Sequence, residues 1–144
     1  MTPKAIQLPE LRRSEFDGAT LFSLLKRYSS IWDTRVAPET RRRVAAEIFE
    51  PEGHYTDPQV GPLSPMALCD HVEQFAALCP GYRTEPTSGV DAYCRSLRFS
   101  WRIVDADGRP AEFPGSSGLD FVRVSERGLL QEVVGFFGEL AKSP

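Results

Sequence analysis

Three polar residues of this sequence stand beside apolar segments, and their side chains are of types that can transfer protons. Tyr28 lies on an apolar stripe with helical spacing, Asp57 ends a short alternating segment before a proline, and Asp120 stands between a leucine and a phenylalanine. Carboxyl and phenol groups can serve as general acids and bases. Each residue also has an ordinary explanation: a core tyrosine, a turn aspartate, and a strand aspartate that points to solvent.

The histidines and cysteines do not form a ligand set. His71 shares a predicted helix face with a leucine and a phenylalanine, so it is either a hydrogen-bonded core residue or a pocket residue. His54 follows a glycine, and we expect it to be exposed. Two histidines without ligand spacing predict no metal site. The three cysteines, Cys69, Cys79 and Cys94, are odd in number and lack C-x-x-C spacing, which favours a reducing, cytoplasmic compartment.

The composition is typical of one globular domain and does not indicate a nucleic-acid or membrane partner. The chain has 144 residues, of which 41% are apolar and 26% charged, and a formal net charge of -3. Nucleic-acid binding would call for a basic excess, so we expect no nucleic-acid partner. No segment has the ~18 apolar residues of a membrane span, and residues 1–11 lack the apolar run of a signal peptide. We expect neither a membrane partner nor a cofactor.

The first segment and the first helix are told apart by periodicity. Residues 1–14 carry prolines and arginines without any period and predict an irregular N-terminal arm. After Ser14, apolar residues recur at intervals of three and four, which predicts an amphipathic helix. The stripe consists of Leu21, Leu24, Leu25, Tyr28, Ile31 and Trp32.

Two further helices follow. Pro38 suits the first position of a second helix, because its missing N–H costs nothing there. We expect Arg41–Arg43 to form a solvated face of this helix, and Pro51 and Gly53 to end it. Ser64 followed by proline is a helix start, with the serine as cap.

The second half of the chain changes to strands. Between residues 97 and 103 large apolar residues alternate with serine and arginine, which predicts a strand with one buried and one wet face. Asp107-Gly108 is a hairpin turn signal. Other strands are expected over 54–57, 82–87, 119–124 and 129–137. Helices followed by mostly antiparallel strands indicate an α+β fold.

Several short segments, taken in order, resemble the SnoaL-like proteins of the nuclear transport factor two superfamily. The resemblance covers residues 20 to 140. It rests on Tyr28 with Trp32-Asp33, Tyr55-Thr56-Asp57-Pro58, the strand from Leu97 to Ile103, Gly118-Leu119-Asp120-Phe121, and Val134-Gly135-Phe136-Phe137-Gly138.

The resemblance implies the architecture and the assembly. The fold would be a cone-shaped α+β barrel of the cystatin-like type, with three N-terminal helices packed on a strongly curved, mostly antiparallel sheet. Residues 1–14 would be the arm and residues 15–144 a single SnoaL-like domain. Members of this superfamily usually pair through their sheets, so a homodimer is implied. Residues 112–117 are an unusual segment that could narrow the mouth of the pocket.

The family also implies roles for the three polar residues. Each matches a position that carries catalysis in ketosteroid isomerases. In those enzymes an aspartate before proline is the general base, and a tyrosine and a second aspartate form the oxyanion hole. The second aspartate is kept neutral there by its apolar site. Asp57 would then be the base, with Tyr28 and Asp120 as donors.

The remaining candidates would form the wall of a substrate pocket. They are Trp32, Tyr55, His71, Phe75, Phe99, Trp101, Val133, Gly135 and Phe137. The sequence therefore predicts a pocket for a small apolar molecule, with isomerase or cyclase chemistry on a carbonyl compound. The alternative is a non-catalytic, dimeric module for ligand binding or protein interaction, because this superfamily also contains such proteins.

Overall fold

The structure is a computed structural model that describes residues 5–144. Three helices precede most of the strands, as the sequence predicts. The helices are α1 (Gly18–Ile31), α2 (Pro38–Ile48) and α3 (Pro65–Leu78). The strands are β1 (Phe49–Thr56), β2 (Arg83–Pro86), β3 (Asp91–Tyr93), β4 (Ser96–Val104), β5 (Ser117–Val124) and β6 (Leu130–Phe137).

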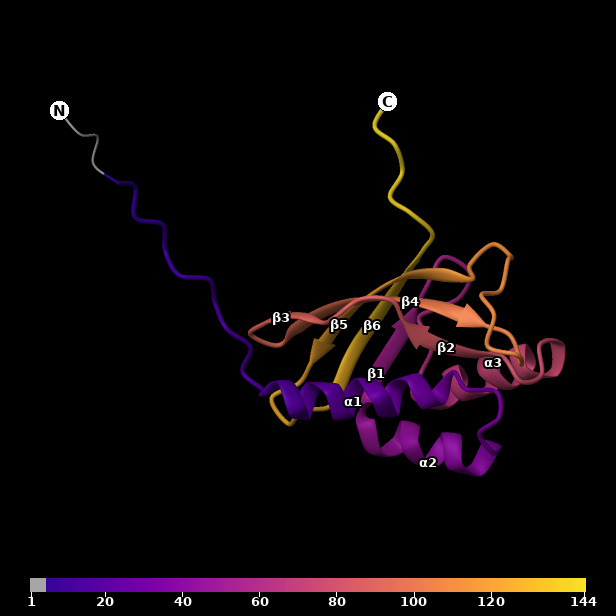
Figure 1. The fold of residues 1–144 in the computed structure, drawn as a ribbon. Helices are drawn as coiled ribbons and strands as arrows, with labels where there is room; N and C mark the ends of the chain where they lie inside the picture. The colour runs from indigo at the N-terminus through magenta and orange to yellow at the C-terminus, as the bar shows by residue number, and fades with distance from the viewer. Residues whose placement is uncertain (1–4) are drawn as a thin grey trace.

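One six-stranded sheet carries the fold. Its strand order is β1-β6-β5-β4-β2, and β3 also pairs with β4. Every pair is antiparallel except that between β1 and β6, which is parallel. The helices lie on one side of the sheet (Figure 1). This is the α+β arrangement, mostly antiparallel, that the sequence predicts.

The helix starts follow local chemistry. Asp17 accepts a hydrogen bond from the backbone N–H of Thr20 at 2.7 Å, and Ser64 accepts one from Ala67 at 3.1 Å. These caps satisfy N–H groups that have no partner inside the helix. Prolines occupy the first position of α2 and of α3. The caps therefore help to fix where α1 and α3 begin, whereas α2 begins at a proline without a side-chain cap.

The end of α2 differs from the prediction. Pro51 and Gly53 were expected to end the helix in a turn, but α2 ends at Ile48 and β1 begins at the next residue. Both residues lie within β1, where the register against β6 shifts between Phe49 and His54. Proline and glycine are tolerated at such an irregularity on an edge strand. The outcome is a strand longer than predicted, which leads directly to Asp57.

The prediction of a solvated arginine face on α2 is wrong for Arg41. Its side chain is 1% exposed, and its guanidinium donates hydrogen bonds to the carbonyl oxygens of Ile31, Asp33 and Val36. These carbonyls lie in the last turn of α1 and in the connection to α2. An arginine can be buried when carbonyl oxygens take up its donors. Arg43 is exposed, as predicted.

The N-terminal arm is described from residue 5 onward. Residues 5–13 are exposed and lie outside helices and strands, and Figure 1 shows them extending away from the body of the molecule. The first four residues of the predicted arm lie outside the described residues. The last residues of the arm form backbone hydrogen bonds with Cys94. The N–H of Cys94 donates to the carbonyl oxygen of Arg13, and the N–H of Glu15 donates to the carbonyl oxygen of Cys94.

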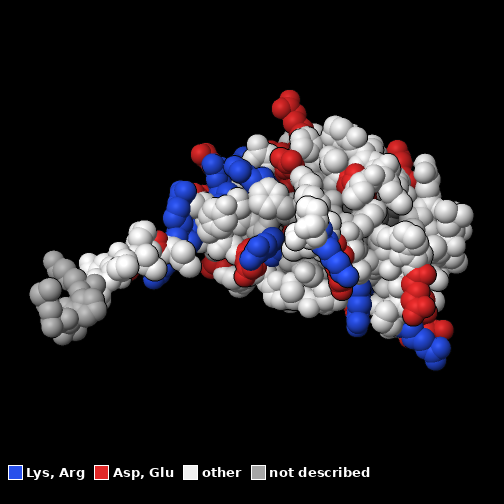
Figure 2. Space-filling view, turned by 90° about the horizontal axis from the view of Figure 1, so that it is seen from above, with Lys and Arg blue, Asp and Glu red and all other residues white. Residues whose placement is uncertain are grey.

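The described helices are all too short or too polar to cross a bilayer. On the side opposite α1 and α2, acidic and basic side chains are interspersed with wide uncharged areas, without a continuous basic stripe (Figure 2).

Candidate functional site

A cavity of about 940 Å³ lies between α1, α3 and the sheet. This volume is at the upper end of what is usual for small-molecule sites. Most of its wall is apolar or aromatic. The wall includes Phe16, Leu21, Phe22, Leu25, Tyr28, Trp32, Tyr55, Phe75, Leu78, Val90, Phe99, Trp101, Ile103, Phe113 and Phe137.

Asp120 is the buried carboxyl of this cavity. It lies in β5 with its side chain on the inner face, and the residue is 4% exposed. The indole N–H of Trp101, on the neighbouring strand, donates to Asp120 Oδ1 at 2.9 Å. Burial raises the pKa of Asp120 to about 7, with a smaller upward contribution from the charge of Asp57; hydrogen bonds from Trp101 and Tyr28 act in the opposite direction.

Tyr28 links α1 to this carboxyl. It is fully buried, and its hydroxyl oxygen accepts a hydrogen bond from the indole N–H of Trp32 at 3.0 Å. Burial, reinforced by the charge of Asp120, raises the pKa of Tyr28 well above its ordinary value. The hydroxyl therefore keeps its proton and remains a donor toward Asp120. Residues 28 and 32 are one helical turn apart, which is why a single helix face presents both.

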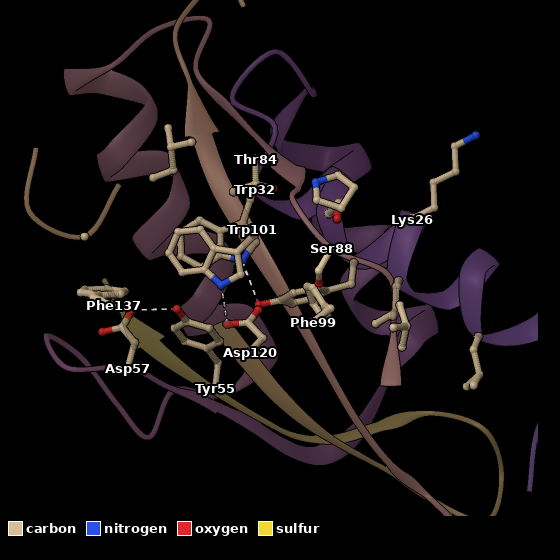
Figure 3. Close-up of a pocket in the computed structure, with 18 of the residues that line it drawn as sticks. Lys26, Trp32, Tyr55, Asp57, Thr84, Ser88, Phe99, Trp101, Asp120 and Phe137 are labelled. Carbon is tan, nitrogen blue, oxygen red and sulfur yellow. Dashed lines mark hydrogen bonds between the residues drawn. The ribbon is translucent and has the colours of Figure 1, made fainter. Parts of the chain in front are cut away.

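Asp57 is held by three donors where β1 ends. The Tyr55 hydroxyl donates to Asp57 Oδ2 at 2.7 Å, and the backbone N–H groups of Gln59 and Val60 donate to Oδ1 at 2.7 and 3.0 Å. The turn interpretation of this aspartate is thus also correct, because it closes an Asx-type turn. Figure 3 shows that Asp57, Tyr55 and Asp120 lie together on one side of the cavity.

Gly135 lies behind these polar groups rather than on the cavity wall. It pairs with Asp120 across β5 and β6. A Cβ atom at this position would be 3.1 Å from Asp120 Oδ1, 3.3 Å from the Tyr55 hydroxyl and 3.4 Å from Asp57 Cβ. The missing side chain therefore makes room for the two carboxyls and the phenol. Gly135 was expected to be part of the pocket wall, but it does not line the cavity.

Most of the predicted wall residues line the cavity. They are Trp32, Tyr55, His71, Phe75, Phe99, Trp101 and Phe137. Val133 does not: it is completely buried in the core, opposite Tyr55 on β1 and Val122 on β5. The cavity follows only the Phe137 end of β6, and the helices cover the rest of the inner face. His71 contacts Trp32, with ring centroids 6.1 Å apart.

The ends of the cavity are formed by residues that were not predicted as wall residues from the sequence. Ser14, Phe16 and Gly18, at the junction of the arm and α1, line it, although they carry no periodic signal. Phe113, Pro114 and Gly115 also line it, which places part of the 112–117 segment at the wall. Within residues 5–144, no cluster of three or more His, Cys, Asp or Glu side chains could hold a metal ion.

A comparison with protein-family models gives no match, and a search of curated proteins gives none either. Solved structures do match. A SnoaL-like family protein from Agrobacterium tumefaciens, named as a candidate isomerase, superposes with a TM-score of 0.72 at 24% identity, over 84% of this chain and 99% of that one.

Two other solved structures extend the comparison. A candidate SnoaL-like polyketide cyclase from Jannaschia has a TM-score of 0.65 at 12% identity, over 89% of this chain and 91% of that one. An NTF2-like protein of unknown function from Exiguobacterium has a TM-score of 0.62 at 15% identity, over 81% and 99%. At these identities the likeness concerns the fold. The chain has the fold of the SnoaL-like and NTF2-like proteins.

Proposed function

We propose that this chain is a cofactor-independent isomerase or cyclase that moves a proton on a small, largely apolar carbonyl compound. The observation that carries the proposal is Asp120, a buried carboxyl on the wall of an apolar cavity, with a pKa of about 7. A general acid or base is most effective when its pKa lies near the working pH. A buried carboxyl also lowers stability, so a functional role is the simplest reason to keep one there.

The geometry favours Asp120 over Asp57 as the group that takes the proton. Both oxygens of Asp57 already accept hydrogen bonds, from Tyr55 and from two backbone N–H groups. These contacts hold Asp57 in place, and its charge contributes to the raised pKa of Asp120. Asp120 instead titrates near neutrality within the cavity. The assignment of Asp57 as the base, implied by the family resemblance, is kept as the competing outcome of the test.

In the proposed step, the Asp120 carboxylate takes a proton from the carbon beside the carbonyl group. The C–H electron pair forms the double bond of the enolate, and the carbonyl π pair moves onto the oxygen. Once Asp120 is protonated it attracts the Tyr28 hydrogen less, and this O–H can turn toward the enolate oxygen. In an isomerisation Asp120 returns the proton to a conjugated carbon. In a cyclisation the enolate carbon attacks a second carbonyl, whose π pair moves onto its oxygen, and Asp120 returns the proton to this alkoxide.

The structural neighbours agree with this class of chemistry. Two of them are named as a candidate isomerase and a candidate SnoaL-like polyketide cyclase. These names support the class of reaction proposed here, and the contacts of Asp120 and Tyr28 support the proposed roles.

The test is hydrogen exchange beside the carbonyl group. Ketones of increasing size are incubated with the protein in D2O, and α-deuteration is followed by NMR, together with isomerisation of a β,γ-unsaturated ketone. We expect exchange that rises with pH through about 7, as Asp120 ionises. Asp120→Asn should lower the rate by at least ~100-fold, the usual contribution of a general base. Asp107→Asn, in an exposed turn, is the matched control.

Two results would change the assignment. Loss of exchange in Asp57→Asn, with most of the rate kept in Asp120→Asn, would return the base to Asp57. Ligand binding without exchange at any pH would make the chain a non-catalytic binding module.

A further inference from the structure

The cavity runs along the whole of α1. Residues that line it recur on one face of the helix, from its first residue to its C-cap. They are Gly18, Leu21, Phe22, Leu25, Lys26, Tyr28, Ser29 and Trp32. With 1.5 Å of rise per residue, this face is roughly 20 Å long. The cavity is therefore elongated, and its far end lies where the arm joins α1, at Ser14 and Phe16.

Groups that could recognise a polar ligand are concentrated at the other end. Asp120, Tyr28 and Asp57 all belong to the part of the cavity near the C-terminus of α1. Toward the far end, the hydroxyl of Ser88 donates to the Gly89 carbonyl at 2.7 Å and accepts from the Ser100 N–H at 2.8 Å, so it has little left to offer.

Ser14 and Lys26 do not make the far end of the cavity polar. The Ser14 oxygen accepts from the N–H of Phe16 at 3.1 Å, a bond within the chain's own turn. Lys26 is exposed, and Figure 3 shows its side chain extending away from the two aspartates. The neighbours at this end are apolar, including Leu21, Leu25 and Phe22. The far half of the cavity is thus built for hydrocarbon.

We propose that the ligand is a long, single-headed molecule: a carbonyl or phenol-like head beside Asp120 and Tyr28, with a linear hydrocarbon tail that follows α1 to the arm. A compact fused-ring compound would fill the head region and leave the rest of the face uncovered. This inference rests on the proposed function for the identity of the head. The inference that the ligand has a hydrocarbon tail rests only on the shape and polarity of the cavity.

The test uses 4-alkylphenols from ethyl to decyl, because their single hydroxyl is a head that can form hydrogen bonds with Asp120 and Tyr28. Binding is measured by calorimetry at pH 8. Each buried methylene should increase affinity by roughly two- to fourfold, since transfer of hydrocarbon from water is favourable. Affinity should rise along the series until the tail reaches the arm. An affinity that stays constant beyond the first few carbons would overturn the proposal.

A substitution at the far end gives the matched control. Gly18 has open space around the position of a Cβ atom, so Gly18→Leu should insert a side chain into the cavity without strain. We expect it to weaken binding of decylphenol at least tenfold and to leave ethylphenol unchanged. Ser23→Leu adds the same bulk to an exposed position of α1 that does not line the cavity, and should change neither. Equal effects of Gly18→Leu on both phenols would contradict a tail at this end.

The two proposals fail in different ways. If affinity rises with chain length but is insensitive to Asp120→Asn and Tyr28→Phe, the tail is correct and the proposed chemistry of the head is wrong. If ethylphenol binds and depends on Asp120 but longer tails add nothing, the head is correct and the tail is wrong. If no member of the series binds, both are overturned.

Discussion

At the scale of single residues, Asp120 is held between two opposing influences. Burial disfavours its charge, whereas the donors Trp101 and Tyr28 favour it. The balance leaves the carboxyl ionising at about 7, where a small change in its surroundings changes its charge. Removing one donor at a time should therefore show how much each hydrogen bond lowers the pKa of Asp120.

We predict that Trp101→Phe raises the pKa of Asp120 above its wild-type value, by roughly 1 or more. The ring is kept, but the N–H that stabilises the carboxylate is lost, and a hydrogen bond to a charged group contributes ~1.5–3 kcal/mol. The measurement is an NMR titration of the Asp120 carboxyl carbon. Trp32→Phe is the control, because its N–H reaches Tyr28 and not Asp120, and it should shift the titration less. A lower pKa in Trp101→Phe would contradict the assignment.

Asp120 should also make stability depend on pH. Its folded-state pKa is raised from 3.8 to about 7, so between these values the folded state holds the proton more tightly than the unfolded state. The contribution of this residue to stability is therefore largest below pH 4, falls as the pH rises toward 7, and is level above that.

Asp120→Asn removes this titration. We predict that the free energy of unfolding of the variant, relative to wild type, increases between pH 4.5 and pH 8, by at most roughly 4 kcal/mol. Urea unfolding at three pH values measures it, with Asp107→Asn as the control. A difference that is the same at all pH values would show that Asp120 does not titrate in this range.

At the scale of helices and strands, features that depend on neighbouring residues were predicted from the sequence, whereas features that depend on strand pairing were not. The cap at Ser64, the proline that begins α2 and the alternation along β4 act within a few residues, and the structure has each of them. The length of β1 depends on its pairing with β6, far away in the sequence, so Pro51 and Gly53 were misread as a helix stop. The role of Gly135 could not be predicted for the same reason, because it depends on the side chains of Asp120, Tyr55 and Asp57, which are distant in the sequence.

Arg41 shows the same limit on a helix. Three arginines in a row resemble a solvated face, and only the path of the chain after α1 reveals that one of them is buried among carbonyl oxygens. The three candidate residues Tyr28, Asp57 and Asp120 were found from the sequence because each carries a polar group next to an apolar segment. Their hydrogen-bond partners Trp32, Tyr55 and Trp101 were predicted only as wall residues.

We predict that Arg41→Met destabilises the protein by roughly 3 kcal/mol or more. The carbonyl oxygens of Ile31 and Val36 would lose the guanidinium as donor, whereas that of Asp33 would keep the backbone N–H of Val36; each buried unpaired group costs ~1–3 kcal/mol. Arg43→Met is the matched control two residues away, exposed and expected to cost less than ~0.5 kcal/mol. Thermal and urea unfolding compare the two. Equal losses would mean that the helix propensity, not the buried network, is responsible.

At the scale of the whole molecule, the outer face of the sheet is the surface to consider. Leu119 pairs with Phe136, and Phe121 with Val134, so four apolar side chains adjoin one another across β5 and β6. All four are at least partly exposed, and Phe136 is 58% exposed. An exposed apolar patch of this kind is typical of an interface.

We predict that two copies associate through this face and bury more than ~1,000 Å² in total. Sedimentation equilibrium at micromolar concentration should give the mass of a homodimer. Phe136→Glu should shift the protein to monomer, whereas Leu140→Glu, in the exposed C-terminal segment, should not. A wild-type protein that is monomeric throughout this range would contradict the prediction.

The parallel pairing of β1 with β6 has a consequence for synthesis on the ribosome. β1 is the first strand to emerge, and β6, which is the last strand of the described chain, provides its neighbour in the sheet. The helices can form while the chain is still growing, but Asp57 and Asp120 meet only after β6 is inserted between β1 and β5. A contact of such long sequence separation forms slowly. Nascent chains that end before Leu130 should therefore contain helices without a cavity, and depend on protection from aggregation until β6 has emerged.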